Sequence, residues 1–333
     1  MASYAFEPGS SLGPQVRRVM RRQVKSAVRA LAQEVNAASI HRARRCLKRC
    51  RSLLLLVRQP RGKRGWTSEA EILKTASDRL AGARDVQAKL DALSHIETTA
   101  GEAALVPAFA RLRRSIDSNR RAHEQGIDLA MIERLGSELE VVVRRISRKR
   151  LRGFDDKVAM AGVAATYGKA RRAMRKAYRS GADEDFHDWR KHVQRHWRHM
   201  QLFEAAWPDE IAVRIGAARQ VSELLGDDHD LWMLVSDLEA DKHRTAPGRR
   251  QRMIALGRDR QAELKARAHQ IGAWLFAEKP AAFGRRLGVY WSAAAERAAV
   301  ARTAADSDRV RDGKTGKRAS RASKVATVEH SVT

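Results

Sequence analysis

The chain has 333 residues, and its 66 Lys and Arg residues outnumber its 39 Asp and Glu residues, giving a formal net charge of +27. Hydrophobic residues make up 43% of the sequence, which is enough to bury a core and excludes a chain disordered throughout. A charge this far from zero repels itself, so a polyanionic partner is expected.

The predicted elements are all helices. Residues 1–13 are predicted to form a flexible leader. Residues 301–333 lack apolar periodicity and are expected to form a disordered basic tail. Between them no run alternates apolar and polar residues as a half-buried strand would, so the predicted fold class is all-α. Helices are expected near 14–36, 38–58, 68–96, 103–125, 128–150, 155–179, 184–206, 208–241, 248–277 and 281–300.

Two features of the domain at 14–300 occur twice, in the same order. The segment IHRARRCLKRCRSLLLL aligns with FHDWRKHVQRHWRHMQL, pairing His41 with His187, and LAGARDV aligns with LGDDHDL, pairing Asp85 with Asp230. The two His-to-Asp separations are 44 and 43 residues. This agreement predicts an internal duplication, with halves at about 14–150 and 151–300, that forms two pseudo-symmetric helical bundles around a basic central groove.

The duplicated helices each carry a concentrated cationic face. At about 100° per residue, the side chains that share or flank this face on the first helix are His41, Arg44, Arg45, Lys48, Arg49 and Arg51. The second helix repeats it with His187, Arg190, Lys191, Gln194, Arg195 and Arg198. Basic rows on the preceding helices comprise Arg18, Arg22, Lys25 and Arg29 in the first half, and Arg171 and Arg175, between Tyr167 and Tyr178, in the second.

These faces contain few acidic partners at i±4, which an ordinary solvated helix carries, so anion binding is favoured over a plain surface. The planar fork of arginine suits phosphate because it donates two parallel charge-assisted hydrogen bonds. Asp85 and Asp230 are interpreted as structural carboxylates that pair with arginines or helix-end amides and so position the basic face. They do not form a paired-carboxylate motif, so acid–base catalysis has no support.

The H-x-x-R-x-x-x-K-R-x-R of residues 41–51, the FHDWRK of 186–191 and the later G-x-x-R-D and LGDDHDL segments resemble the CHAD family (conserved histidine α-helical domain). The resemblance implies an all-helical protein that binds inorganic polyphosphate and can locate to polyphosphate granules. The lack of a catalytic motif predicts binding without catalysis, and the lack of an evident secretory signal or bilayer-spanning stretch predicts a cytoplasmic protein. The resemblance points to the phosphate ligands His41, Arg44, Lys48, Arg51, His187, Arg190 and Lys191. Gln194 stands where the first copy has Lys48, and Trp197 where it has Arg51, which puts the contacts of the second half in doubt.

Several alternatives stay open. Sequence-independent nucleic-acid binding fits the pI of about 11.1, although aromatics are only 5% and give little sign of a stacking platform. A docking module whose partner is an acidic protein is a further alternative. Beside polyphosphate itself, enzymes that metabolise polyphosphate are expected partners. His192, His196 and His199 have i, i+4, i+7 spacing that a metal could use, but an aromatic-packed helix face is favoured. No cofactor, metal or membrane partner is expected.

Overall fold

The structure is a computed structural model. It describes residues 4–33, 36–58, 66–80, 82–101, 105–124, 129–148, 151, 153–240 and 245–328. Within these ranges all regular structure is helical, which confirms the all-α fold class.

Within the described residues the first half of the chain contributes the α-helices α1 (Leu12–Gln33), α2 (Ala37–Arg58), α3 (Thr67–Arg79), α4 (Gly82–Ala100), α5 (Val106–Glu124) and α6 (Leu129–Arg148). The second half contributes α7 (Asp156–Ser180), α8 (Asp183–Leu202), the short 3-10 helix η3 (Glu204–Ala206), α9 (Pro208–Glu239), α10 (Pro247–Leu275) and α11 (Pro280–Val328).

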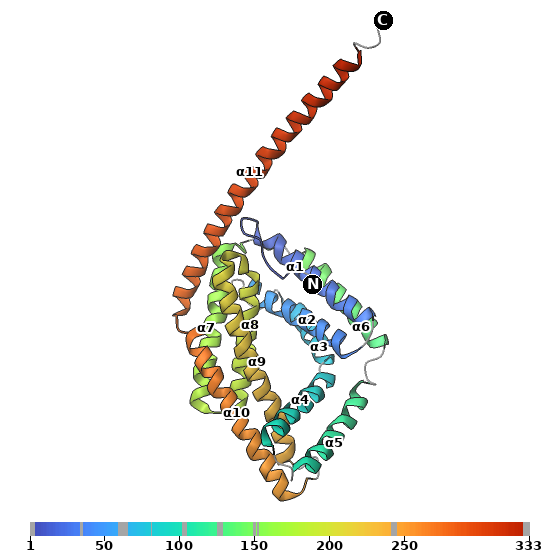
Figure 1. Cartoon of the computed structure of the whole chain (residues 1–333), viewed down its shortest axis with the longest axis vertical. Helices are drawn as coiled ribbons and strands as arrows, with labels where there is room; N and C mark the ends of the chain where they lie inside the picture. Colours follow the sequence, from blue (N-terminus) through green and yellow to red (C-terminus); the bar gives the residue numbers. More distant parts are fainter. Residues whose placement is uncertain are drawn as a thin grey trace.

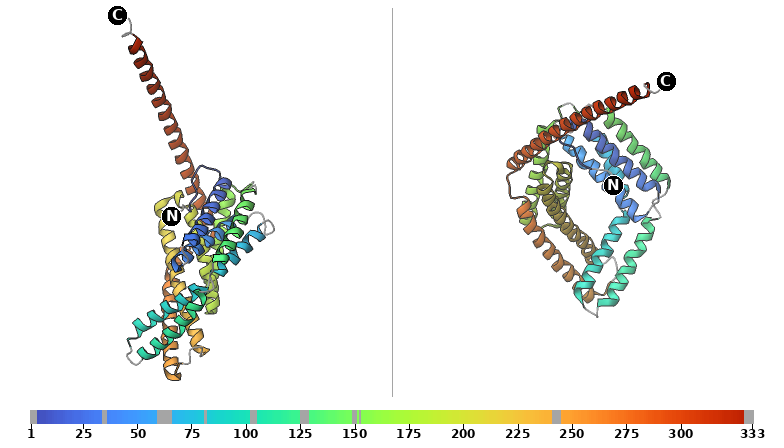
Figure 2. Two further views of the ribbon diagram at one scale, coloured as in Figure 1. Left: turned by 90° about the vertical axis from the view of Figure 1, so that its right-hand side faces the viewer. Right: turned by 45° about the horizontal axis from the view of Figure 1, so that its top comes forward.

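The described helices form two groups that meet along α2 and α8 (Figure 1). In the first group α1 packs against α2 and α6, and in the second α7 packs against α8 and α11. Helices α4 and α5 form an arm that lies beside α9 and α10, and both further views show it at the end of the body away from the tail (Figure 2). The matching neighbours agree with two related bundles, while the duplication itself stays a prediction.

The single helix expected at 68–96 is two helices. Helix α3 ends at Arg79, Leu80 turns out of the helix at φ −92° and ψ 13° with its side chain fully buried, and α4 begins at Gly82. Glycine is a weak helix former, so the turn at this position costs little. The aligned stretch around Gly226 lies within the uninterrupted helix α9.

The interpretation of residues 1–13 as a flexible leader is wrong for residues 4–13. Tyr4 and Phe6 are buried, the Phe6 amide donates to the Leu202 carbonyl over 2.8 Å, and the Tyr4 hydroxyl donates to the Arg49 carbonyl over 3.1 Å. The Phe6 ring also meets Phe203 edge-on at 5.3 Å between centroids. Two aromatic side chains bury enough apolar area to hold this short segment on the body.

The tail also differs from the expectation. Helix α11 does not end near 300 but continues to Val328 and leaves the body (Figure 1). The stretch just beyond Trp291 is rich in alanine, and alanine has the highest helix propensity, so a helix can continue without packing. Tyr167 of α7 fixes the packed start of α11 by stacking on Phe283 at 4.3 Å between ring centroids.

Candidate anion-binding site

A groove of about 580 Å³ opens between α2, α3 and α8, with one further residue from α7. Its walls bring together side chains that lie more than 140 residues apart in the sequence. Nine of the residues predicted to bind phosphate line it: Arg44, Lys48, Arg51, His187, Arg190, Lys191, Gln194, Arg195 and Arg198. The geometry therefore places the cationic faces of α2 and α8 on one cavity, while their role as ligands stays a prediction.

The α2 wall is held in place by backbone contacts. The Arg44 guanidinium donates from Nη1 to the Ser77 carbonyl of α3 over 2.9 Å. Ser52 is buried, and its hydroxyl donates to the Arg195 carbonyl of α8 over 3.3 Å. The opposite side of α2 is packed into the core, including the fully buried Leu47 and Leu53. This separation of core and cation faces is the amphipathic pattern that the sequence predicted.

The α8 wall contains arginines that are less exposed to solvent than arginines on a protein surface usually are. Arg198 donates to the Gln194 backbone carbonyl over 2.9 Å and to the Gln194 Oε1 over 3.3 Å, so Gln194 supports Arg198. Burial, together with the nearby cations Arg49 and Arg195, lowers the pKa of Arg198 to about 10 despite the opposing effect of Tyr4. Burial also lowers the pKa of Arg195. A cation that is shielded from water gains the most favourable electrostatic free energy from binding an anion.

Helix α9 supports Arg190 and His187 from behind. A Cβ on Gly226 would lie 2.8 Å from Arg190 Nη2, so the absent side chain leaves the space that the guanidinium uses. The His187 ring stacks on His229 with centroids 4.1 Å apart. Burial and the neighbouring His229, Lys191 and Arg190 lower the pKa of His187 to about 4, so this imidazole is neutral at pH 7.

Asp230 follows His229 on α9, with 3.6 Å between His229 Nδ1 and Asp230 Oδ1. It also lines a second pocket of about 300 Å³ with Asp227 and Arg260. Asp230 does not line the groove between α2, α3 and α8, and its structural role stays a prediction. The side chain of Asp85, to which the same role was assigned, lies outside the described residues.

Eight predicted ligands lie outside the groove lining. Arg49 covers the Tyr4 ring at 5.0 Å, Arg18 pairs with Glu7 over 2.7 Å, and Arg171 donates to the Phe276 carbonyl over 2.8 Å. These three cations are used in packing, which periodicity alone could not distinguish from a ligand face. The remaining five are Arg22, Lys25, His41 and Arg175, which are exposed, and Arg45, which is half-buried.

Two groove cations were missed by sequence reasoning. Lys74 lies on α3, outside both repeated motifs, and Lys169 lies on α7, two residues before Arg171. The choice of the α7 face between Tyr167 and Tyr178 was wrong for the groove, because both tyrosines turn toward the α10 and α11 side. Tyr167 donates to the Glu278 carbonyl and Tyr178 to the Lys265 carbonyl. The α3 wall also carries two carboxylates, Glu71 and Asp78.

The histidines considered for metal binding are built into the core. His199 is fully buried, 2.8 Å from the Ser52 carbonyl through Nε2 and 2.9 Å from the Thr166 hydroxyl through Nδ1. Because a carbonyl only accepts, Nε2 carries the proton and Nδ1 accepts from Thr166. His196 packs among aromatic rings, including Tyr167 at 5.4 Å. Among the described residues no group of three metal-ligating side chains forms.

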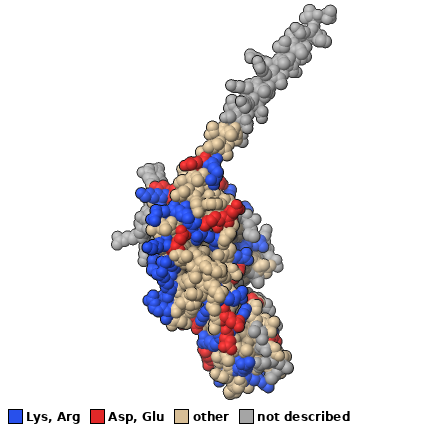
Figure 3. All heavy atoms as spheres, turned by 60° about the vertical axis from the view of Figure 1, so that its left-hand side comes forward, with Lys and Arg blue, Asp and Glu red and all other residues tan. Residues whose placement is uncertain are grey.

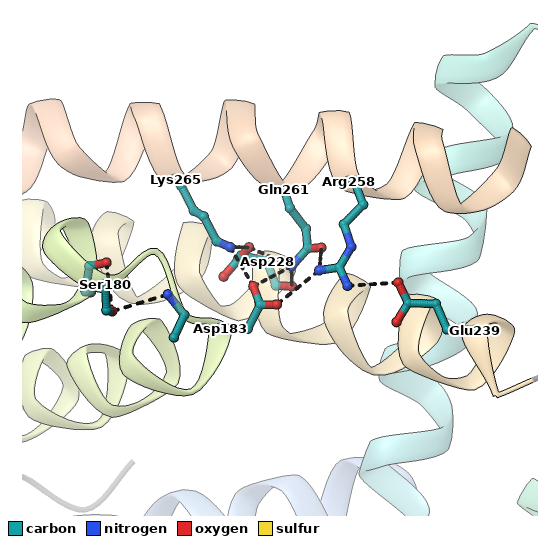
Figure 4. Close-up of polar contacts among 9 residues, drawn as sticks. Ser180, Asp183, Asp228, Glu239, Arg258, Gln261 and Lys265 are labelled. Atoms are coloured by element: carbon teal, nitrogen blue, oxygen red, sulfur yellow. Dashed lines mark hydrogen bonds and ion pairs between the residues drawn. The ribbon is translucent and has the colours of Figure 1, made fainter. Parts of the chain in front are cut away.

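The start of α8 is fixed by a polar network with α9 and α10 (Figure 4). Asp183, in the first turn of α8, accepts from Lys265 over 2.6 Å and from Arg258 over 3.0 Å. Gln261 donates to Asp183 and, over 3.1 Å, to the carboxylate of Asp228. Burial raises the pKa of Asp228 to about 6, although Lys265 opposes the shift. This network orients the helix on which six groove residues lie.

Charge is unevenly distributed over the surface. Figure 3 shows Lys and Arg side chains gathered along one edge of the helical body, with acidic side chains interspersed elsewhere on that face. No helix in the described part of the chain is both long enough and apolar enough to cross a bilayer.

Comparison with known proteins identifies the fold. The family model of the CHAD domain matches residues 15–239, which end at the last residue of α9. The CHAD domain from the plant Ricinus communis is similar in structure, with a TM-score of 0.59 and 16% identity over 82% of this chain and 94% of that one. PptA from Streptomyces chartreusis is similar with a TM-score of 0.56 and 15% identity, over 81% of this chain and 100% of that one. No curated protein sequence matches. Because the family match covers more than half of the sequence and the fold agrees, the chain belongs to the CHAD family.

Proposed function

We propose that this protein binds inorganic polyphosphate, without cleaving it, in the groove between α2, α3 and α8. The observation that carries the proposal is the convergence of nine Lys and Arg side chains on one cavity: Arg44, Lys48, Arg51, Lys74, Lys169, Arg190, Lys191, Arg195 and Arg198. Such crowding of like charge is unfavourable in the free protein and is relieved by an anion.

The groove suits a phosphate chain better than a nucleic acid. Among the described residues that line it, none is Phe, Tyr or Trp, so the lining offers no aromatic platform on which an unpaired base could stack. Guanidinium groups on facing helices can instead donate to successive phosphates on both sides of a thin polymer. The family resemblance supports the same ligand.

The lining groups donate hydrogen bonds and position an anion, and nothing in that task requires turnover. Glu71 and Asp78 precede and follow Lys74 on α3 and line the same wall, where they reduce the net positive charge of the groove. Location on polyphosphate granules in the cytoplasm, and contact with enzymes that make or use the polymer there, would follow from binding.

Equilibrium binding tests the proposal directly. The purified full chain is titrated with long-chain polyphosphate, duplex DNA and single-stranded DNA of matched total charge, at several salt concentrations. We expect polyphosphate to bind more tightly than either nucleic acid at each salt concentration, with no release of orthophosphate with or without divalent metal. Equal affinity for all three would favour a nucleic-acid-binding protein, and orthophosphate release abolished by a groove substitution would contradict non-catalytic binding.

A further inference from the structure

Helix α7 carries a row of cations that the groove does not fully use. The 24 residues 157–180 contain seven Lys and Arg and no Asp or Glu. Lys169, Arg172 and Lys176 recur at i, i+3 and i+7 and therefore share one face of the helix. Lys169 is in the groove lining, and Arg172 and Lys176 are exposed beyond it. The row thus begins in the groove and leaves it along the surface.

Contacts with α8 fix where the row lies. Lys169 and Arg172 both act electrostatically on His192 of α8, whose pKa is lowered chiefly by burial and also by Arg195 and by these two cations. At the far end, Lys176 Nζ lies 2.6 Å from Asp185 Oδ1 in the first turn of α8. The row therefore follows α8 for about 10 Å, from the groove toward the beginning of that helix.

The first half of the chain contains a matching row. A shift of 147 residues, which also superposes the last residues of α1 and α7, pairs Arg22, Lys25 and Arg29 with Lys169, Arg172 and Lys176. Arg22, Lys25 and Arg29 are all exposed, as are Arg172 and Lys176. The two rows differ in one respect, because none of the α1 cations lines the groove whereas Lys169 does. Continuity with the groove is therefore a property of the α7 row.

We propose that the row of Lys169, Arg172 and Lys176 is a second binding site, continuous with the groove, for the part of a phosphate polymer that extends beyond it. This proposal rests on the proposed function. A polymer that occupies the groove brings its next phosphates to the row at high effective concentration, so weak surface contacts add to the affinity. Short polyanions that end within the groove do not reach Arg172 or Lys176.

An ordinary solvated face would also carry exposed cations, but it would contain acidic partners on the same helix. The described partner of Lys176 is Asp185 on the neighbouring helix, and α7 itself has no acidic residue between Lys157 and its last residue, Ser180. The Lys176 side chain is 71% exposed and that of Asp185 is 16% exposed, but Asp185 also accepts a hydrogen bond from the Ser180 hydroxyl over 2.7 Å and keeps this partner when Lys176 turns away. Lys176 can therefore exchange Asp185 for a phosphate at small cost.

The test compares two probes and two matched variants. Arg172→Gln with Lys176→Gln removes two charges from the row, and Arg111→Gln with Arg114→Gln removes two charges from the exposed face of α5, which packs against α4. Each full-length protein is titrated with tripolyphosphate and with long-chain polyphosphate across salt. Circular dichroism checks that the helical signal is unchanged.

For the row variant we expect long-chain affinity to fall about three- to tenfold, and the slope of log affinity against log salt to become shallower by about one per lost contact. Tripolyphosphate affinity should stay at the wild-type value, and the α5 variant should match the wild type for both probes. Equal losses in the two variants, no loss in the row variant, or the same loss for both probes would overturn the proposal. A wild-type protein that binds neither probe would instead contradict the proposed function.

Discussion

The two main walls of the groove come from matching segments of the sequence but are built differently. The α2 wall presents Arg44, Lys48 and Arg51, with leucines and cysteines packed behind it. The α8 wall also contributes six lining residues, but all six are polar or charged and four of them are arginine or lysine, and its hidden face includes His196, His199 and Trp189. The α8 cations are also the more desolvated, as the lowered pKa of Arg195 and of Arg198 shows.

The difference indicates where binding energy is concentrated. A cation that is already short of water loses less solvation when a phosphate arrives, and a side chain held by its neighbours loses less conformational freedom. On α8, Arg190 lies against the backbone at Gly226 and Gln194 holds Arg198, so two cations are positioned before the polymer arrives. On α2 one cation, Arg44, is held in this way by the Ser77 carbonyl. We therefore expect the α8 wall to dominate affinity and the α2 wall to add to it.

Charge reversal in each wall gives the largest expected effect. Arg190→Glu with Lys191→Glu should weaken polyphosphate binding by about 100-fold, or about 2.7 kcal/mol, because two positioned cations become repulsive. Arg44→Glu with Lys48→Glu should weaken it by about tenfold. Isothermal titration at constant salt measures both, with circular dichroism to confirm folding.

The control for this pair reverses Arg111 and Arg114 on α5, since the α10 arginines are unsuitable. Arg258 holds Asp183 and Glu239, and Arg260 pairs with Glu263, so reversing them would disturb the network behind α8. If the control loses as much affinity as the α8 variant, the attraction is diffuse charge. A larger loss from the α2 pair would reverse the ranking of the walls.

The contact between the walls should be sensitive to His199. His199→Leu removes two hydrogen bonds that join α8 to α2 and α7, and we expect the free energy of unfolding to fall by about 2 kcal/mol. Urea denaturation at pH 7 measures this loss. Equal stability of variant and wild type would show that the hydrogen bonds of His199 contribute little.

The pH dependence of the same variant provides a second readout. Burial lowers the pKa of His199 to about 4, below the ordinary value of 6.5, so between these values the unfolded chain takes up a proton that the folded chain does not. Wild-type stability therefore loses this contribution as pH falls from 6.5 toward 4, and nothing changes above 6.5. The stability difference between wild type and His199→Leu should shrink over the same range.

Much of this architecture could be predicted from the sequence because periodicity and repetition report which helix face is buried. The cation faces of α2 and α8 were identified, and nine of their residues meet in the groove. Periodicity could not show which of the predicted cations make contacts within the protein instead of lining the groove. Arg171 and Arg49 both fit the predicted cation pattern. Arg171, however, donates to the Phe276 carbonyl, and Arg49 covers the Tyr4 ring. Only the tertiary structure shows these contacts.

The errors have the same physical origin. Lys74 and Lys169 reach the groove through the tertiary arrangement of α3 and α7, and no local signal distinguishes them from surface lysines. The leader was read as flexible because two aromatics in a short polar segment have no periodicity, although burial of Phe6 decides its structure. The break between α3 and α4 depends on how Leu80 packs, which the helical pattern of 68–96 conceals.

A smaller effect tests whether α9 positions the α8 wall. Gly226→Ala places a Cβ 2.8 Å from Arg190 Nη2, and the flexible guanidinium can move aside. We expect affinity for polyphosphate to fall about fivefold while the free energy of unfolding stays equal or rises, since alanine favours a helix more than glycine does. Titration and urea denaturation of the same preparation separate the two. A loss of stability that accompanies the loss of binding would argue against displacement of Arg190 alone.

The smallest expected effect concerns protonation of His187. In the free protein burial, His229 on α9, and Lys191 and Arg190 on α8 lower the pKa of this imidazole to about 4, and Asp188 opposes them. A bound polyanion offsets the charge of those cations and raises the pKa of His187. Binding of the polymer is therefore coupled to proton uptake by His187 as pH falls. At higher pH the imidazole is neutral in both the free and the bound protein, so it does not change the affinity. We expect affinity to rise about two- to threefold between pH 7.5 and pH 5.5. His187→Gln keeps a hydrogen-bond donor but cannot titrate, so its affinity should lack this rise after the titration of polyphosphate itself is subtracted. The same slope in both proteins would show that His187 remains neutral when the polymer is bound and acts by hydrogen bonding alone.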